Sequence, residues 1–244
     1  SPQSAGYEDP LHKTWVRSTI AHNTVTVDGR PMIPYDVEVD SVWKTDGARG
    51  LESDGVLELF QVEGPFKACR ASNEAVYPGI RLDRTLVLTD RIILDLFRVI
   101  GTGPHQYDYA MHIGGRPSTA TEYASAAPLR GIGYDHLKNV RTIRAPAGIA
   151  DLTWETAGSP LRAVLQADEG SEILLADDPA TEKAQAFGAL EPLPRSSALV
   201  VRSRGDQAMF LSMWSTEAHN LEMIVEDGRA DGDVVVRTQI GSQV

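Results

Sequence analysis

Residues 81–99 read RLDRTLVLTDRIILDLFRV, and this stretch decides the fold class. Its two arms, 81–88 and 92–99, alternate between apolar and polar side chains over much of their length, and a polar triplet separates them. Alternation on both sides of a short polar turn is typical of a β-hairpin. In the second arm, Leu94 and Leu96 share one face of the strand. We therefore expect two antiparallel strands here, with one face buried.

The same pattern extends along the chain in both directions. Asp-Gly pairs, such as Asp28-Gly29, supply the positive φ that tight hairpins need. We expect Gly101-Thr102-Gly103-Pro104 to break the chain and Arg204-Gly205-Asp206 to form a hairpin turn. Further alternating or β-branched runs predict strands at 24–27, 37–40, 57–62, 163–166, 172–175, 198–202, 208–212 and 233–237.

Helix is expected to be scarce. The 244 residues include 14 prolines and 21 glycines, which interrupt almost every stretch long enough for an amphipathic helix. One or two helical turns near 180–186 are the exception. Many short strands with turn signals between them indicate an all-β protein, built as a large antiparallel β-sandwich of the supersandwich-like kind. We assign residues 1–244 to one β-sandwich domain.

Composition excludes several classes of protein. Lys and Arg number 23 against 34 Asp and Glu, and this net charge of −11 argues against a general nucleic-acid-binding protein. The apolar runs stop far short of the roughly 18 residues that a membrane span needs. A single cysteine, Cys69, excludes an internal disulfide and a multi-thiolate zinc site.

Tyr7, Trp15, Arg17 and His22 lie close together near the start of the chain. His22 precedes an alternating run, which places its imidazole at the entrance of a strand. One ring nitrogen there could bind zinc while the other donates to a carbonyl. The alternative is that His22-Asn23 caps the strand and satisfies neighbouring backbone groups. No HxH, HExxH or carboxylate pair lies near enough in sequence to complete a metal site locally.

Residues 105–112, HQYDYAMH, form a second group of polar and aromatic side chains. In an extended strand His105, Tyr107 and Tyr109 point to one face and Asp108 to the other. A row of His and Tyr can stack on sugars and hydrogen-bond to them, which makes His105 and Tyr107 candidate substrate-binding residues. The same row is equally typical of a half-buried sheet face packed by aromatic side chains.

Residues 15–29, WVRSTIAHNTVTVDG, resemble the heparinase II/III-like superfamily of polysaccharide lyases, which includes alginate, oligoalginate and heparinoid lyases. The string Arg-Ser-Thr-x-x-His-Asn-Thr-Val-x-Val-Asp-Gly is quite specific to that family. The strand pair 84–88 and 94–99 and residues 105–113 add to the resemblance. It covers the C-terminal β-sandwich part alone, and so implies that the family's N-terminal α/α toroid is absent from this chain.

The resemblance implies cleavage of uronate-containing chains by β-elimination. In such lyases a Tyr, usually with a His, moves protons around C5 of the sugar while polar groups neutralise the carboxylate. It implies that His22 is one zinc ligand, the others coming from upstream, and that Tyr7 transfers protons or contacts substrate. Arg17 would position a uronate carboxylate through its guanidinium fork. As an alternative, Arg17 is the buried partner of an Asp.

The main expectation is therefore part of a polysaccharide lyase that is incomplete on its own, a fragment or one partner of a split enzyme. A non-catalytic carbohydrate-binding or scaffolding sandwich, in which residues 105–112 contact sugar, is the first alternative. A structural domain packed against another chain is the second. The expected partners are an acidic polysaccharide or oligosaccharide and a toroid domain or chain, and a homo-oligomer stays open. We expect a periplasmic or secreted location, with a cytoplasmic one as the alternative.

Overall fold

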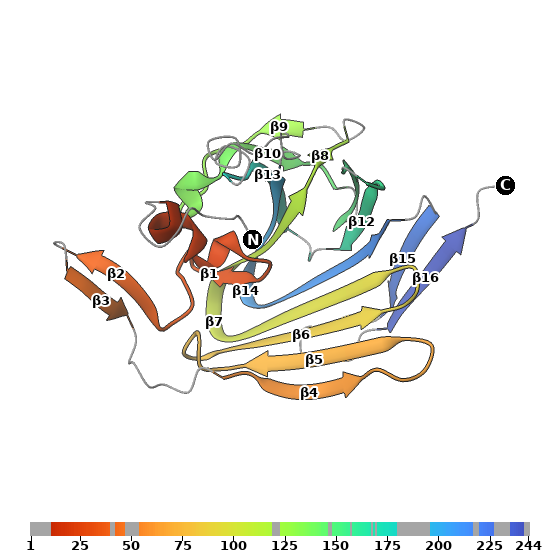
Figure 1. Cartoon of the computed structure of the whole chain (residues 1–244), viewed down its shortest axis with the longest axis horizontal. Coiled ribbons are helices and arrows are strands. Elements are labelled where there is room, and N and C mark those ends of the chain that lie inside the picture. Colours follow the sequence, from red (N-terminus) through yellow and green to blue (C-terminus); the bar gives the residue numbers. More distant parts are fainter. Residues whose placement is uncertain are drawn as a thin grey trace.

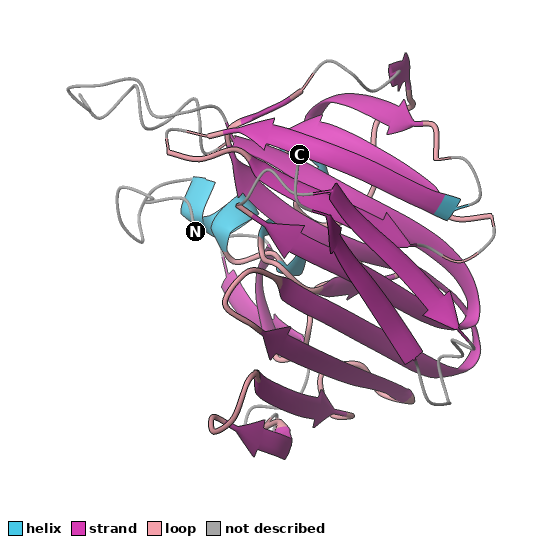
Figure 2. Ribbon diagram, turned by 90° about the vertical axis from the view of Figure 1, so that its right-hand side faces the viewer, coloured by secondary structure: helices cyan, strands magenta, loops and turns pink. Residues whose placement is uncertain are grey.

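The computed structural model describes residues 11–39, 42–46, 54–118, 123–145, 148–156, 158–166, 168, 170–179, 196–216, 220–226 and 235–241. Strands dominate these residues, and Figure 2 shows how little helix accompanies them. The helical turns are η1 (His12–Val16), η2 (Thr19–Ala21) and η3 (Tyr134–His136). The strands are β1 (Val25–Val27), β2 (Tyr35–Val39), β3 (Val42–Asp46), β4 (Val56–Gln61), β5 (Lys67–Asn73), β6 (Ile80–Leu88), β7 (Ile93–Gly114), β8 (Arg116–Pro117), β9 (Tyr123–Ser125), β10 (Lys138–Ile143), β11 (Ile149–Glu155), β12 (Leu161–Gln166), β13 (Glu172–Asp177), β14 (Ser196–Ser215), β15 (Asn220–Glu226) and β16 (Val235–Gly241).

One sheet of 12 strands holds most of these elements. Its path runs β4-β5-β6-β7-β14-β12-β11-β8, with β1 paired to β7 and the strands β13, β10 and β9 joined through β14. The strand pairs β2–β3 and β15–β16 form two further hairpins. The hairpin expected at 81–99 is confirmed as β6 and β7, which pair antiparallel with Leu88 opposite Ile93. Ile92, Leu94 and Leu96 gather in one apolar cluster, as their alternation predicts.

The two longest strands, β7 and β14, connect the layers of the molecule. They pair antiparallel from Gly114 and Ser196 at one end to Ile93 and Trp214 at the other. Both strands bend in mid-course, so that β4, β5 and β6 continue one layer while β9, β10 and β13 lie in the other (Figure 1). The expected all-β sandwich is therefore confirmed, and it is folded from one large curved sheet.

The chain break expected at 101–104 and the hairpin turn expected at 204–206 are wrong, since neither stretch ends a strand. Residues 101–104 and 204–206 lie inside β7 and β14, where the register jumps from Gly205 opposite His105 to Gln207 opposite Ile100, so that 101–104 bulge out of the pairing with β14, which resumes beyond them. A bulge of this kind bends a strand instead of terminating it. Gly101 lies in the bend, and a Cβ atom there would lie 2.6 Å from the Tyr107 hydroxyl oxygen, so the close approach requires glycine.

Apolar clusters pack on both faces of β7. The cluster between the layers includes Phe97, Tyr109 and Phe210, and the rings of Tyr109 and Phe210 stack with centroids 5.3 Å apart. The cluster on the opposite face includes Trp15 and Ile20, which come from the N-terminal segment. Burial of these side chains holds the N-terminal segment against the sheet.

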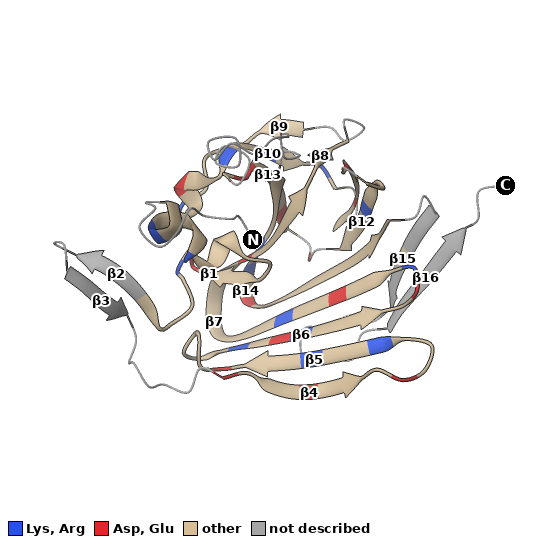
Figure 3. Ribbon diagram, in the orientation of Figure 1, with Lys and Arg blue, Asp and Glu red and all other residues tan. Residues whose placement is uncertain are grey.

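Basic and acidic residues lie near one another along the strands of the sheet (Figure 3). Arg84 of β6 donates to both oxygens of the buried Asp95 of β7, at 3.0 and 2.6 Å. Asp108, which is fully buried, accepts from Arg202 at 2.7 and 2.8 Å and from the Tyr134 hydroxyl at 2.6 Å. Both of these buried carboxylates are therefore paired, as burial in a protein interior requires.

Two expectations concern helices. The turns expected near 180–186 lie outside the described residues. Within the residues that the structure describes, no helix is long and apolar enough to cross a membrane.

Candidate functional site

The segment between η1 and β1 is fastened to the sheet. Trp15 is fully buried, and its carbonyl oxygen accepts from both the backbone nitrogen and the hydroxyl of Ser18, at 2.8 and 2.6 Å. Gly133, with φ of 87°, brings a neighbouring loop directly against Ser18. β1 then pairs with β7, with Val25 opposite Tyr109. The polar residues of this segment are therefore presented from a well-packed base.

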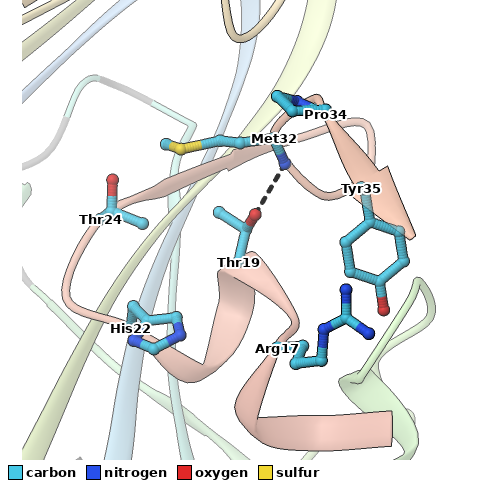
Figure 4. Close-up of a pocket in the computed structure, with 7 residues that line it drawn as sticks. All are labelled: Arg17, Thr19, His22, Thr24, Met32, Pro34 and Tyr35. Carbon is cyan, nitrogen blue, oxygen red and sulfur yellow. Dashed lines mark hydrogen bonds between the residues drawn. The ribbon is translucent and has the colours of Figure 1, made fainter. Parts of the chain in front are cut away.

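An open pocket of about 440 Å³ lies over this segment (Figure 4). The segment contributes one wall, and the chain that follows β1 contributes the other. The Thr19 hydroxyl accepts from the backbone nitrogen of Met32 at 2.7 Å, which ties the two walls together. The lining residues are Arg17, Thr19, His22, Thr24, Met32, Pro34 and Tyr35.

His22 lies on the rim of this pocket with an exposed side chain. Its Nε2 atom is 2.8 Å from the carbonyl oxygen of Val16, so this nitrogen carries the hydrogen and donates it. The contact satisfies the backbone carbonyl of Val16, as expected if His22 serves to satisfy neighbouring backbone groups, which was the alternative to a metal ligand. It also leaves Nδ1 as the nitrogen that can accept a hydrogen bond or bind a metal.

Arg17 and Tyr35 lie beside each other in the lining of the pocket. In Figure 4 the Arg17 guanidinium lies close to the hydroxyl end of the Tyr35 ring. Burial raises the pKa of Tyr35 above its ordinary value, and the positive charge of Arg17 partly opposes that rise. The phenol is therefore neutral near pH 7 and acts as a hydrogen-bond donor. Tyr35 was not predicted from the sequence, because no local pattern marks a tyrosine that reaches the pocket only when the chain turns back after β1.

Asn23 is held from two sides. Its backbone carbonyl accepts from the Arg84 guanidinium at 2.7 Å, and its side-chain oxygen accepts from the backbone nitrogen of His112 at 2.8 Å. These two bonds join the residue after His22 to β6 and β7. Within the His22-Asn23 pair, His22 therefore exposes its imidazole while Asn23 fixes the backbone to the sheet. The sequence spacing alone did not predict these two different roles.

His105 lies apart from the pocket. Its Nδ1 atom is 2.8 Å from Oδ2 of Asp28, and Oδ1 of the same carboxylate accepts from the backbone nitrogen of Gln106 at 2.9 Å. Partial burial raises the pKa of Asp28, but these hydrogen bonds and the nearby positive charges outweigh it, so the net pKa lies below its ordinary value. His105 is therefore engaged with the Asp28 turn, and its expected contact with substrate stays a prediction.

Tyr107 is buried in the cluster between the layers, with no exposed side-chain surface. Its hydroxyl donates to the carbonyl oxygen of Asp206 at 3.1 Å, and burial raises its pKa to about 12. Tyr109 is buried in the same cluster. The row of aromatic rings therefore packs the sheet, which was the alternative interpretation, and Tyr107 has no surface with which to contact a sugar.

The structure thus brings Arg17 and His22 together in one pocket and leaves His105 and Tyr107 outside it. Tyr7, the candidate for proton transfer, lies outside the described residues. Among the described residues, no group of three or more His, Cys, Asp or Glu side chains could hold a metal ion. His22 could supply one ligand to a metal through Nδ1, because its Nε2 donates to a carbonyl, as the second nitrogen of a metal-binding imidazole usually does.

Comparison with known proteins gives a consistent result. The family profile described as "Heparinase II/III-like, C-terminal" matches residues 4–211. An alginate lyase from Stenotrophomonas maltophilia (strain K279a) is 28% identical over 138 residues, which are 52% of this chain and 17% of that protein.

Solved structures share the fold. A structure titled "Heparinase III-BT4657 gene product" superposes with a TM-score of 0.59 at 12% identity, over 98% of this chain and 32% of that one. The heparan sulfate lyase HepC from Pedobacter heparinus gives a TM-score of 0.51 at 12% identity, over 93% of this chain and 31% of that one. The chain therefore spans about a third of these solved proteins and under a fifth of the alginate lyase.

Proposed function

The chain belongs to the heparinase II/III-like family through its C-terminal domain, and on this premise we propose that it is the β-sandwich part of a polysaccharide lyase. The proposed substrate is a uronate-containing acidic polysaccharide, cleaved by β-elimination. We propose further that an N-terminal toroid, in the same protein or in a partner chain, supplies the rest of the cleft.

One observation carries this proposal: Arg17 and His22, from the segment that resembles the family most, line the same open pocket as Tyr35. β-Elimination needs the C5 proton of a uronate to become acidic, and it does so when the negative charge of the neighbouring carboxylate is offset. A guanidinium matches a carboxylate with two parallel hydrogen bonds. Arg17 is therefore assigned to the uronate carboxylate.

The phenols have different tasks in this proposal. Because burial keeps Tyr35 protonated, its hydroxyl can donate to a carboxylate or sugar oxygen but is a poor base. Proton transfer at C5 is assigned to Tyr7, as the family resemblance suggests. His22 is assigned to zinc as one ligand, with the remaining ligands upstream of this chain. A bound zinc ion would add positive charge beneath the cleft.

The binding-module alternative has less support. It required residues 105–112 to offer a row of aromatic side chains to a sugar, and Tyr107 and Tyr109 are both buried.

We place the intact protein in the periplasm or outside the cell, where fractionation of the native host would find it.

Eliminative cleavage is tested by completing the cleft. The chain, joined to its toroid or mixed with it, is incubated with alginate, heparan sulfate and glucuronan in turn, and the ultraviolet absorbance of unsaturated uronate is followed. Product from one of these polymers supports the lyase, and no product from any of them refutes it.

The role of Arg17 has a matched control. Arg17→Ala should lower kcat/KM by about 100-fold or more, the usual loss when a group that stabilises developing charge is removed. Arg30 is exposed and lies outside the pocket lining, so Arg30→Ala should stay near the wild type. Equal losses in the two variants would exclude the assigned role.

A further inference from the structure

We propose that His112 is the positioning residue of the candidate site, because its ring holds the η2 turn that presents His22. His112 lies near the end of β7, opposite Ala198 of β14. Its side chain is 14% exposed and contacts the N-terminal segment from the side of the sheet. The link to lyase chemistry rests on the proposed function, but the hold on η2 does not.

Both ring nitrogens of His112 face oxygen atoms. Nε2 lies 2.8 Å from the carbonyl oxygen of Ile20, and Nδ1 lies 2.6 Å from Oδ2 of Asp178, whose side chain is 3% exposed. A carbonyl oxygen only accepts, so Nε2 must carry a hydrogen. A second hydrogen must lie between Nδ1 and the carboxyl oxygen, since two bare lone pairs would repel at that distance. This pair of hydrogens fixes the orientation of the ring.

His112 is connected to three parts of the N-terminal segment, to two of them through its ring and to the third through its backbone. Ile20 is the middle residue of η2, and the backbone nitrogen of His22 donates to Thr19 of the same turn at 3.1 Å. The Trp15 ring meets the His112 ring edge-on, with centroids 5.6 Å apart. The backbone nitrogen of His112 donates to the side chain of Asn23. One residue of β7 therefore contacts the chain before, within and after the turn that ends at His22.

This arrangement explains how an exposed imidazole can have a defined direction. His22 itself packs against little, since its side chain is exposed. Its Nε2–H bond to the Val16 carbonyl sets the direction of the ring, and the position of His22 relative to Val16 depends on the backbone of η2, which the Nε2–H of His112 holds at the Ile20 carbonyl. Pre-organisation of a ligand or catalytic group through a neighbouring hydrogen bond is what binding sites generally need.

Two substitutions separate the hydrogen bond from the packing. A glutamine amide reaches the position of Nε2, so His112→Gln can still donate to Ile20. An asparagine amide reaches only the position of Nδ1, so His112→Asn keeps a polar group beside Asp178 but loses the bond to η2. The two variants are similar in polarity and differ in the contact that the proposal requires.

The experiment uses the 244-residue chain and nuclear magnetic resonance. In the wild type, the His112 ring should show a protonated Nε2. In His112→Asn, the backbone amides of Ala21 and His22 should exchange with solvent about tenfold faster, the effect of losing one hydrogen bond. The His22 ring should also change from one tautomer, protonated at Nε2, to a mixture. In His112→Gln, exchange should stay within about threefold of the wild type.

Each result decides the proposal. An unprotonated Nε2 on wild-type His112 overturns it without any variant, which also covers the case in which a variant does not fold. Equal exchange rates in the two variants overturn it as well, provided that the amides of β7 at Tyr109 and Ala110 show that both are folded. None of these readouts needs a substrate. A protein that meets them but yields no unsaturated uronate would therefore disprove the lyase and leave the role of His112 in place.

Discussion

Asp108 offers the sharpest test of how this sandwich is stabilised. Its carboxylate is fully buried and accepts two hydrogen bonds from Arg202 and one from Tyr134. Asp108→Asn keeps the shape of the side chain but removes its charge, and the new amide hydrogens face the guanidinium. Arg202, whose side chain is 11% exposed, then loses its buried counter-ion. Breaking a buried pair in this way costs about 3–5 kcal/mol.

This loss is large against the roughly 5–15 kcal/mol that stabilises a typical domain. For a chain of this size, Tm should fall by about 2–4 °C per kcal/mol, or roughly 6–20 °C in total. Urea denaturation followed by tryptophan fluorescence measures the free energy of unfolding, and calorimetry measures Tm. The control is Asp151→Asn, because Asp151 pairs with Arg162 but is 47% exposed, and such pairs contribute about 1 kcal/mol at most. Equal losses in the two variants would refute the reasoning.

Three further predictions concern pH, metal and packing. Burial raises the pKa of Asp83, but the hydrogen bonds and charge of Arg70 outweigh it, so the net pKa lies below its ordinary value. A carboxylate whose pKa is lowered by folding stabilises the folded state above the unfolded pKa of about 3.9, and this stabilisation is lost as the pH falls through the folded-state pKa. The free energy of unfolding of Asp83→Asn should therefore fall less steeply than that of the wild type below about pH 4. An equally steep fall in the two proteins would contradict this. In the protein completed with its toroid, His22→Ala should lower the bound zinc measured by elemental analysis, and tight stoichiometric zinc that survives the change would exclude His22 as a ligand. Gly101→Ala should cost about 1–3 kcal/mol in urea denaturation, since the new Cβ meets the Tyr107 hydroxyl; Gly103→Ala meets nothing within 4 Å and should cost less than about 0.5 kcal/mol, and the reverse order would contradict the packing at the bend.

The elements that the sequence predicted well are those set by local patterns. Alternation in 81–99 identified β6 and β7 and the face that Leu94 and Leu96 share. Asp28-Gly29 was expected to turn the chain, and both residues have positive φ. These features depend on neighbours a few residues away, so the sequence carries them directly.

The features that the sequence predicted poorly depend on partners far along the chain. Glycine and proline at 101–104 signal a break, but β7 pairs with β14, about 100 residues away, on both sides of these residues, and so continues through them as one strand. Alternation in 105–112 separated the two faces correctly, yet it could not distinguish a solvent face from a second buried one, and both faces of β7 are buried over residues 107–110. In the pocket, the string around His22 predicted Arg17 and His22, whereas Tyr35 comes from a different segment.

The shared strands have a consequence for how this architecture can be inherited. Because β7 and β14 each run through both layers, no boundary divides the described sandwich into halves that each retain a full set of strands. Gene fusion or recombination that separated the layers would leave two incomplete sheets with open edges, which favour aggregation. Evolution can therefore exchange partners around this sandwich, but it must transmit the sandwich itself whole.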